Sequence, residues 1–270
     1  MISKFVNTIN GFLAKGIDKG YREGIKSIID LSKKHKFSDP NRLYRINYSS
    51  SDAQAILNFK MEAFTVAGIG SYELEEKLKK LGIKVHEGSI PDFDTFELEA
   101  RNVMMQYGIG LGDQPPSGWL ETNLNTAITS SISAARWNRL NDPDVTDLYP
   151  ALQYNTQEDD RVREEHEVLD KKTYMKDDPV WDIIMPPNGW NCRCYVTPVA
   201  VTEMEDYDVS DRTDKSQREE LSQEVDPNFR RNPGESNSIW GKWMKSSLKE
   251  MPAGQSAKLK QMLKEYYNAL

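Results

Sequence analysis

A short stretch near residue 190 constrains the fold of this chain more than any other part of the sequence does. Pro186-Pro187-Asn188-Gly189 is followed by Trp190 and then by the only two cysteines of the protein, Cys192 and Cys194. Paired prolines before Asn-Gly predict a turn, and the alternation over residues 192–196 predicts a short strand after it. Residues 152–156 alternate in the same way, so we expect the two segments to pair as an antiparallel ribbon.

The first of three interpretations of this region is a metal site. His166 and Asp170 are four residues apart, so a helix would present both on one face, and a strand would place Cys192 and Cys194 on one side. These four side chains are donors that zinc accepts. The Cys-x-Cys spacing counts partly against zinc, because structural zinc sites more often use Cys-x₂₋₄-Cys.

The second interpretation is a polar cluster that fixes the turn by hydrogen bonds among its own charged side chains and with turn carbonyls. Its members would be Asp160, Arg161, Arg163, His166 and Asp170. Three large aromatic side chains would form the core beneath it. These are Tyr154, Trp181 and Trp190.

The third interpretation is catalysis, with His166 as the general base of a metal-dependent nuclease or a related enzyme of mobile-element origin. Sequence gives it little support, since no second histidine and no metal-binding pair of carboxylates stands out nearby. We therefore expect a protein that is not an enzyme.

Several different motifs follow one another in this region in an order that resembles a known protein family. Asp160-Arg161-Val162-Arg163, His166, Leu169-Asp170, Asp178-Pro179 with Trp181, and finally PPNGWNCRC resemble the Mu F-like family of phage head morphogenesis proteins. The resemblance covers roughly residues 120–198. It implies a minor head protein of a tailed phage or prophage, built into the head interior near the portal after assembly in the bacterial cytoplasm. It also implies contacts with portal, scaffold or major coat protein, and a role in head assembly or in DNA packaging or ejection.

The resemblance also bears on cofactors. Some relatives carry Cys-x-x-Cys and then His-x-x-Cys-x-Cys, similar to a closed zinc site. Here the corresponding positions include His166, Cys192 and Cys194, while Arg163 and Gly189 stand where further ligands would be. We therefore expect no obligatory cofactor, with zinc as the open alternative.

We predict an α+β protein with a mainly helical N-terminal half, a small α+β module and an extended C-terminal tail that ends in a helix. The predicted parts are a basic amphipathic arm over 1–50, a helical region over 51–118, the Mu F-like module over 119–200, and an acidic linker with an aromatic-rich tail over 201–270. We interpret 203–226 as a solvated linker or a lone helix because it has few large apolar residues. A helix capped by Ser256 would close the chain.

Glycines and apolar spacing mark the expected helix ends. One helix is predicted from about 52 to 66 and broken by Gly68 and Gly70, and another ends at Gly82 before a strand over 83–85. Asp92 would cap the next helix, and a further helix spans 121–140. The glycine-rich run 108–112 lacks a P-loop ending and follows a helix, so we interpret it as a connector.

Charge is unevenly distributed along the 270 residues. The net charge is −7, yet residues 1–48 hold ten Lys and Arg against four Asp and Glu. A basic segment suits DNA or an acidic protein surface, so we expect residues 1–48 to contact packaged DNA or a head partner. Deletion of this arm should then leave the module folded. No apolar run approaches the roughly 20 residues of a membrane span, so we expect no membrane partner.

Overall fold

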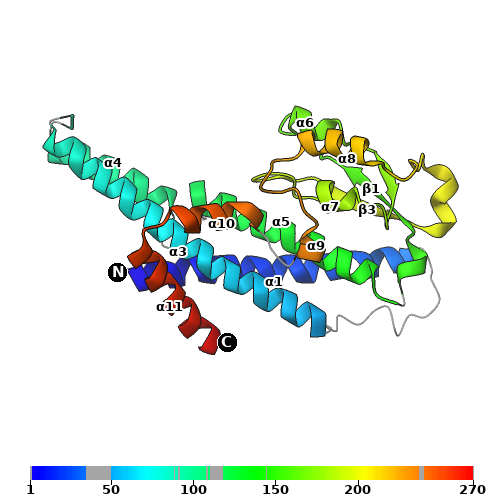
Figure 1. Ribbon diagram of the computed structural model, residues 1–270, viewed down its shortest axis with the longest axis horizontal. Helices are drawn as coiled ribbons and strands as arrows, with labels where there is room; N and C mark the ends of the chain where they lie inside the picture. The colour runs from blue at the N-terminus through cyan, green and yellow to red at the C-terminus, as the bar shows by residue number, and fades with distance from the viewer. Residues whose placement is uncertain are drawn as a thin grey trace. The chain divides into compact units, whose positions relative to one another are not determined.

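A computed structural model describes residues 2–34, 50–87, 89–90, 92–107, 109, 118–143, 145–236 and 240–269. The sequence predicts a connector around Pro40, over residues 37–50, and residues 37–49 of it lie outside these ranges. Gly108 and residues 110–117 of the glycine- and proline-rich stretch also lie outside them. The predicted α+β class is confirmed: long helices precede a small antiparallel sheet, and the chain ends in a helix (Figure 1).

The chain forms two compact units, and each draws on segments that are distant in sequence. The first comprises Met1–Lys15, Lys60–Asn125 and Trp243–Leu270, and the second Gly16–Phe59 and Thr126–Lys242. The division into four successive parts at residues 50, 118 and 200 stays a prediction about which segments fold independently.

The first unit is helical. It contains the start of α1 (Ile2–Lys34), most of α3 (Ser50–His86), all of α4 (Phe93–Gln106) and α11 (Ala253–Ala269), with parts of α5 (Gly118–Leu140) and α10 (Gly241–Glu250). As predicted, Asp92 caps α4 by accepting a hydrogen bond from the Thr95 backbone N–H at 2.7 Å. The ring of Tyr266 on α11 stacks on Phe64 at 4.7 Å between centroids, so the final helix buries part of its aromatic surface within this unit.

Helix α3 corrects three predictions. It runs without a break through Gly68, Gly70 and Gly82, and the strand expected over 83–85 is its last turn. The first two glycines are sites of close packing: a Cβ on Gly68 would clash with the Leu259 side chain, and one on Gly70 would lie 2.5 Å from the ring of Trp119. Because these glycines lack a side chain, α3 can pack closely against residues that are distant in sequence. They do not end the helix here, although isolated glycines often mark a break.

The second unit contains a three-stranded antiparallel sheet in the order β2-β1-β3, with short helices gathered around it (Figure 1). The strands are β1 (Ala151–Asn155), β2 (Thr173–Met175) and β3 (Tyr195–Val199). Tyr154 pairs with Val196, so the predicted ribbon is confirmed. Because β3 begins at Tyr195, however, Cys192 and Cys194 lie in the turn before it and are not strand residues.

The predicted core aromatics lie in this unit. Tyr154 and Trp181 are fully buried, and Trp181 meets Tyr174 edge-on at 6.0 Å between ring centroids. Trp190 is partly buried and meets the ring of Phe229 edge-on at 5.3 Å. Phe229 belongs to the stretch after residue 200, so the core extends beyond the predicted module.

The segment expected to be a solvated linker or a lone helix does contain a helix, and it folds onto the second unit. It forms η2 (Val201–Asp206), α8 (Lys215–Leu221) and η3 (Ser222–Glu224). Leu221 and Val225 are buried in the core, and the buried carboxylate of Asp178 accepts hydrogen bonds from the Thr213 backbone N–H at 2.8 Å and from its hydroxyl. Two apolar anchors and one buried carboxylate thus fix a stretch whose composition is otherwise polar.

The second half of α1 is part of the same unit, and whether residues 1–50 form a separable arm stays a prediction. A Cβ on Gly24 would lie 2.5 Å from the carbonyl oxygen of Ile132 on α5, and Ile28 joins the core. Ser32 lies within hydrogen-bond distance of the Tyr149 hydroxyl, at 3.4 Å. Deletion of residues 1–48 would remove these buried contacts, so we now expect it to destabilise the module.

Candidate metal centre

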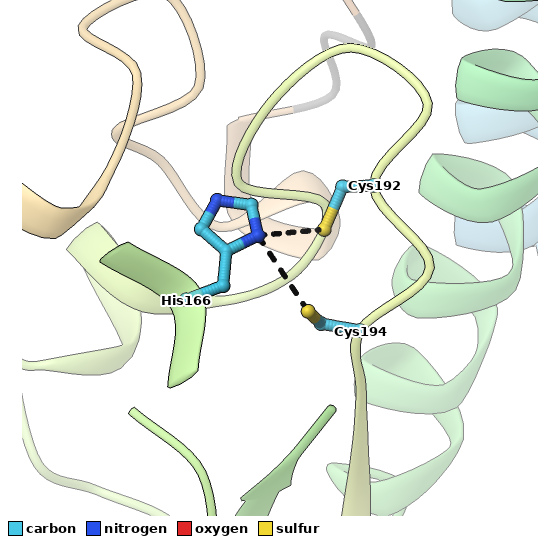
Figure 2. A group of neighbouring side chains, drawn as sticks. All are labelled: His166, Cys192 and Cys194. Atoms are coloured by element: carbon cyan, nitrogen blue, oxygen red, sulfur yellow. Dashed lines mark hydrogen bonds between the residues drawn. The ribbon is translucent and has the colours of Figure 1, made fainter. Parts of the chain in front are cut away.

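His166 and the two cysteines are brought together by one helical turn and one loop. His166 lies on α6 (Glu164–Glu167) and is 3% exposed, while Cys192 and Cys194 are 3% and 4% exposed. The loop turns sharply at Asn191, whose φ of 57° is left-handed, a conformation that asparagine tolerates better than most residues. Figure 2 shows both sulfurs facing the same nitrogen of the imidazole ring.

The distances suit a shared cation. Nδ1 of His166 lies 3.7 Å from Sγ of Cys192 and 3.7 Å from Sγ of Cys194. A single Nδ1 proton can serve only one of two sulfurs, so equal distances favour a positive charge between all three atoms. Zinc bonds of about 2.3 Å to sulfur and 2.0 Å to nitrogen at a tetrahedral angle place the two ligand atoms about 3.5 Å apart. The three donors therefore fit zinc.

The electrostatics favour one thiolate in the pair. The pKa of Cys192 lies well below its usual value, because its sulfur shares a hydrogen bond with Cys194 and is also hydrogen-bonded to His166. The pKa of Cys194 is raised by the same hydrogen bond and by burial. Thiolate is the form of cysteine that binds metals.

A second layer of residues holds the three donors. The amide nitrogen of Asn188 donates to the Tyr154 hydroxyl at 3.1 Å, and that hydroxyl is in turn hydrogen-bonded to Cys194. Arg163 Nη2 donates to the carbonyl of Trp190 at 2.6 Å, which ties α6 to the cysteine loop. A Cβ on Gly189 would lie 3.2 Å from Arg163 Nη1, so this glycine leaves room for the guanidinium.

Asp170 is not brought to the centre. Its Oδ1 accepts a hydrogen bond from the backbone N–H of Thr156 at 2.6 Å. Helix α6 ends at Glu167, so His166 and Asp170 do not share a helix face as expected. Within the described residues, His166, Cys192 and Cys194 are the only three His, Cys, Asp or Glu side chains grouped closely enough to hold a metal ion.

The expected polar cluster is dispersed over neighbouring turns. Arg163 and His166 border the centre, whereas Asp160 and Arg161 are exposed, and Arg161 pairs with Asp159 at 3.5 Å. Sequence reasoning missed the stronger partner of Asp159, since Arg193 donates to both of its oxygens, at 2.7 and 2.5 Å. The available signal was the arginine between the two cysteines, since such an arginine can bridge their loop to a carboxylate nearby.

Comparisons with known proteins match the same region. The family model described as Phage Mu protein F like protein matches residues 54–197. The putative capsid assembly protein F of Escherichia phage Mu is 36% identical over 87 residues, which are 32% of this chain and 19% of that protein. The Mu-like prophage FluMu F protein of Haemophilus influenzae is 38% identical over 77 residues, 28% of this chain and 18% of that protein. The matched stretches thus span less than a fifth of these curated relatives. No solved structure matches this chain.

Proposed function

Because this chain belongs to the Phage Mu protein F like family, we propose that it is a non-enzymatic component of a phage head that acts in head assembly. The observation that carries the proposal is the family match over residues 54–197, together with a relative named as a capsid assembly protein. On this proposal it is a minor head protein in the head interior near the portal. Its partners are portal, scaffold or major coat protein, and residues 1–48 contact packaged DNA.

Burial supports a mechanical role for the matched region. The reactive side chains His166, Cys192 and Cys194 are each at most 4% exposed, and their hydrogen bonds hold a loop against a helix. Preformed rigid surfaces suit assembly contacts, because little conformational entropy is lost when a partner binds. None of the helices in the described parts of the chain is long and apolar enough to cross a bilayer, and the proposal includes no membrane partner.

The test is the composition of assembled particles. Heads purified from cells that carry the gene should contain this chain in few copies, and a gene deletion should reduce the yield of DNA-filled heads. Complementation with the intact gene should restore that yield. Absence of the chain from purified heads, together with an unchanged yield after deletion, would contradict the proposal.

An enzymatic role has less support at this site. The hollow beside His166 is lined by three acidic side chains, Glu165, Glu224 and Asp226, and by two arginines, Arg163 and Arg230. Its lining therefore carries one more negative than positive charge, which does not favour a phosphate backbone. Incubation of the chain with DNA and RNA should therefore leave both intact. Cleavage that is abolished by His166→Ala would instead establish a nuclease.

For the centre itself, we propose that His166, Cys192 and Cys194 hold one zinc ion as a structural staple between α6 and the turn before β3. Zinc bound there would cross-link two segments that are 26 residues apart in sequence and add its binding free energy to folding. These residues supply three of the four ligands that structural zinc usually takes, so water or another donor completes the set.

Metal content tests this staple. Full-length chain purified without chelator should contain about one zinc per molecule, and Cys192→Ser should lose it. Asp170→Asn is the matched control and should keep the metal, since Asp170 binds the Thr156 backbone instead. A wild-type chain that takes up no zinc, or equal loss in both variants, would count against the staple.

A further inference from the structure

The two C-terminal helices carry a surplus of positive charge. Residues 241–270 hold six lysines against two glutamates. Four of these lysines form two pairs, Lys245 with Lys249 on α10 and Lys260 with Lys264 on α11, and all four are exposed. We refer to the two pairs as the lysine stripes.

The stripes differ from those exposed lysines that are neutralised within their own helix, because no acidic residue lies three or four positions from any of the four stripe lysines. Lys19, Lys79 and Lys215 each lie three or four residues from a glutamate on the same helix and form ion pairs with it, at 3.9, 3.2 and 3.5 Å. Over the described residues, no ion pair involves a lysine of the stripes. The positive charge of the stripes is therefore available to an external partner.

Helical spacing makes each stripe self-repelling. Residues four apart on a helix are neighbours, so Lys245 faces Lys249 and Lys260 faces Lys264. Neither Glu250 nor Glu265 lies three or four residues from any lysine, and Glu265 accepts a hydrogen bond from Gln261 at 3.2 Å instead. A bound polyanion would relieve this repulsion.

Packing fixes the direction in which the α11 stripe points. Leu259 is 6% exposed, and Tyr266 stacks on Phe64, so one side of α11 is committed to the first unit. Lys260, Lys264 and the 55% exposed Tyr267 follow one another at spacings of four and three residues on the outer side.

We propose that the lysine stripes bind the phosphate backbone of duplex DNA without sequence preference. Lysine is depleted at protein interfaces, where arginine and buried aromatic anchors dominate. Residues 241–270, which carry the two stripes, contain no arginine. Flexible ammonium groups suit phosphate contacts, which supply most of non-specific DNA affinity. The proposal extends the DNA contacts to a second segment and does not depend on the head-assembly role, because it concerns binding by the isolated chain.

The experiment is fluorescence anisotropy of the full-length chain with a labelled random-sequence duplex of about 30 base pairs, a length that exceeds the few phosphate contacts involved. Four phosphate contacts from the stripes contribute about −3.6 to the log–log salt slope, so this contribution alone should lower affinity on the order of 100-fold between 50 and 200 mM salt. K245Q/K249Q and K260Q/K264Q should each lower the magnitude of the slope by about 1.8. Both variants remove like-charge repulsion, so their circular dichroism spectra should match the wild type.

The control variant K79Q/K215Q removes two exposed positive charges that are already ion-paired and that lie outside residues 1–48, and it should leave the slope unchanged. Absence of wild-type binding at 50 mM salt, or an unaltered slope in the combined variant K245Q/K249Q/K260Q/K264Q, would overturn the proposal. Displacement of the duplex by poly-glutamate as effectively as by unlabelled DNA would also overturn it and would identify an acidic protein as the partner. Each of these results leaves the incorporation of the chain into heads to be judged separately.

Discussion

Replacement of Gly24 by alanine tests how α1 is held in the second unit. A Cβ at this position would lie 2.5 Å from the carbonyl oxygen of Ile132 and 2.7 Å from Cβ of Ala135, both on α5. Neither atom can move without its helix, so α1 and α5 must separate by on the order of 1 Å to restore ordinary contact of about 3.5 Å. That displacement also stretches the hydrogen bond from Arg136 Nε to the Ser27 hydroxyl, which is 2.8 Å long.

The magnitude follows from comparison with Gly11 on the same helix, where an added Cβ meets nothing within 4 Å. Both substitutions gain roughly 0.5–1 kcal/mol from helix propensity and reduced freedom of the unfolded chain. Only Gly24→Ala suffers overpacking, at about 1–3 kcal/mol. Since the propensity gain cancels in the comparison, Gly24→Ala should be less stable than Gly11→Ala by about 1–3 kcal/mol.

Thermal unfolding followed by circular dichroism and tryptophan fluorescence measures this difference. For a chain of this size, 1 kcal/mol shifts the midpoint by about 2–4 °C, so the two variants should differ by roughly 2–12 °C. Equal midpoints would refute the close packing of α1 on α5 and would support a separable N-terminal arm.

Two further predictions concern charged side chains of the second unit. Asp178→Asn should destabilise the chain by about 2–4 kcal/mol in urea unfolding, since the buried carboxylate accepts three hydrogen bonds and an amide group would face donors. Its neighbour Asp177 is exposed, so Asp177→Asn should change stability by less than about 0.5 kcal/mol. The hydrogen bonds from Arg193, helped by Arg161, hold the pKa of Asp159 below its usual value, so this pair stabilises the fold above about pH 4 and less as the carboxylate is protonated. The stability difference between wild type and Arg193→Gln should therefore shrink as the pH falls from 6 to 2, and a constant difference would contradict the pairing.

Local sequence signals identified the matched region and its strands. The order of unlike motifs from Asp160 to Cys194 indicated the family, which the match over residues 54–197 confirms. Alternation identified β1 and its partner β3 because a half-buried strand repeats every two residues. The cap at Asp92 was equally predictable, because an N-cap side chain accepts a hydrogen bond from a backbone N–H only two or three residues further along the chain.

Contacts between segments that are distant in sequence could not be predicted from these local signals. Gly68 and Gly70 suggested helix ends, because nothing near them in sequence reveals Leu259 or Trp119 as packing partners. The polar composition after residue 200 concealed Phe229, a single aromatic side chain that anchors the stretch. Local spacing alone placed Asp170 with His166, whereas the early end of α6 separates them.

The position of Phe229 has a practical consequence for anyone who works with a fragment. Sequence similarity to the family stops at residue 197, yet the ring that covers Trp190 comes from residue 229. A fragment that ends at residue 197 would expose the indole of Trp190 and the surrounding apolar surface to water, which favours aggregation. Fragments that extend to residue 236 retain this cover. The residue at which the family match ends is therefore not the residue at which the second unit ends.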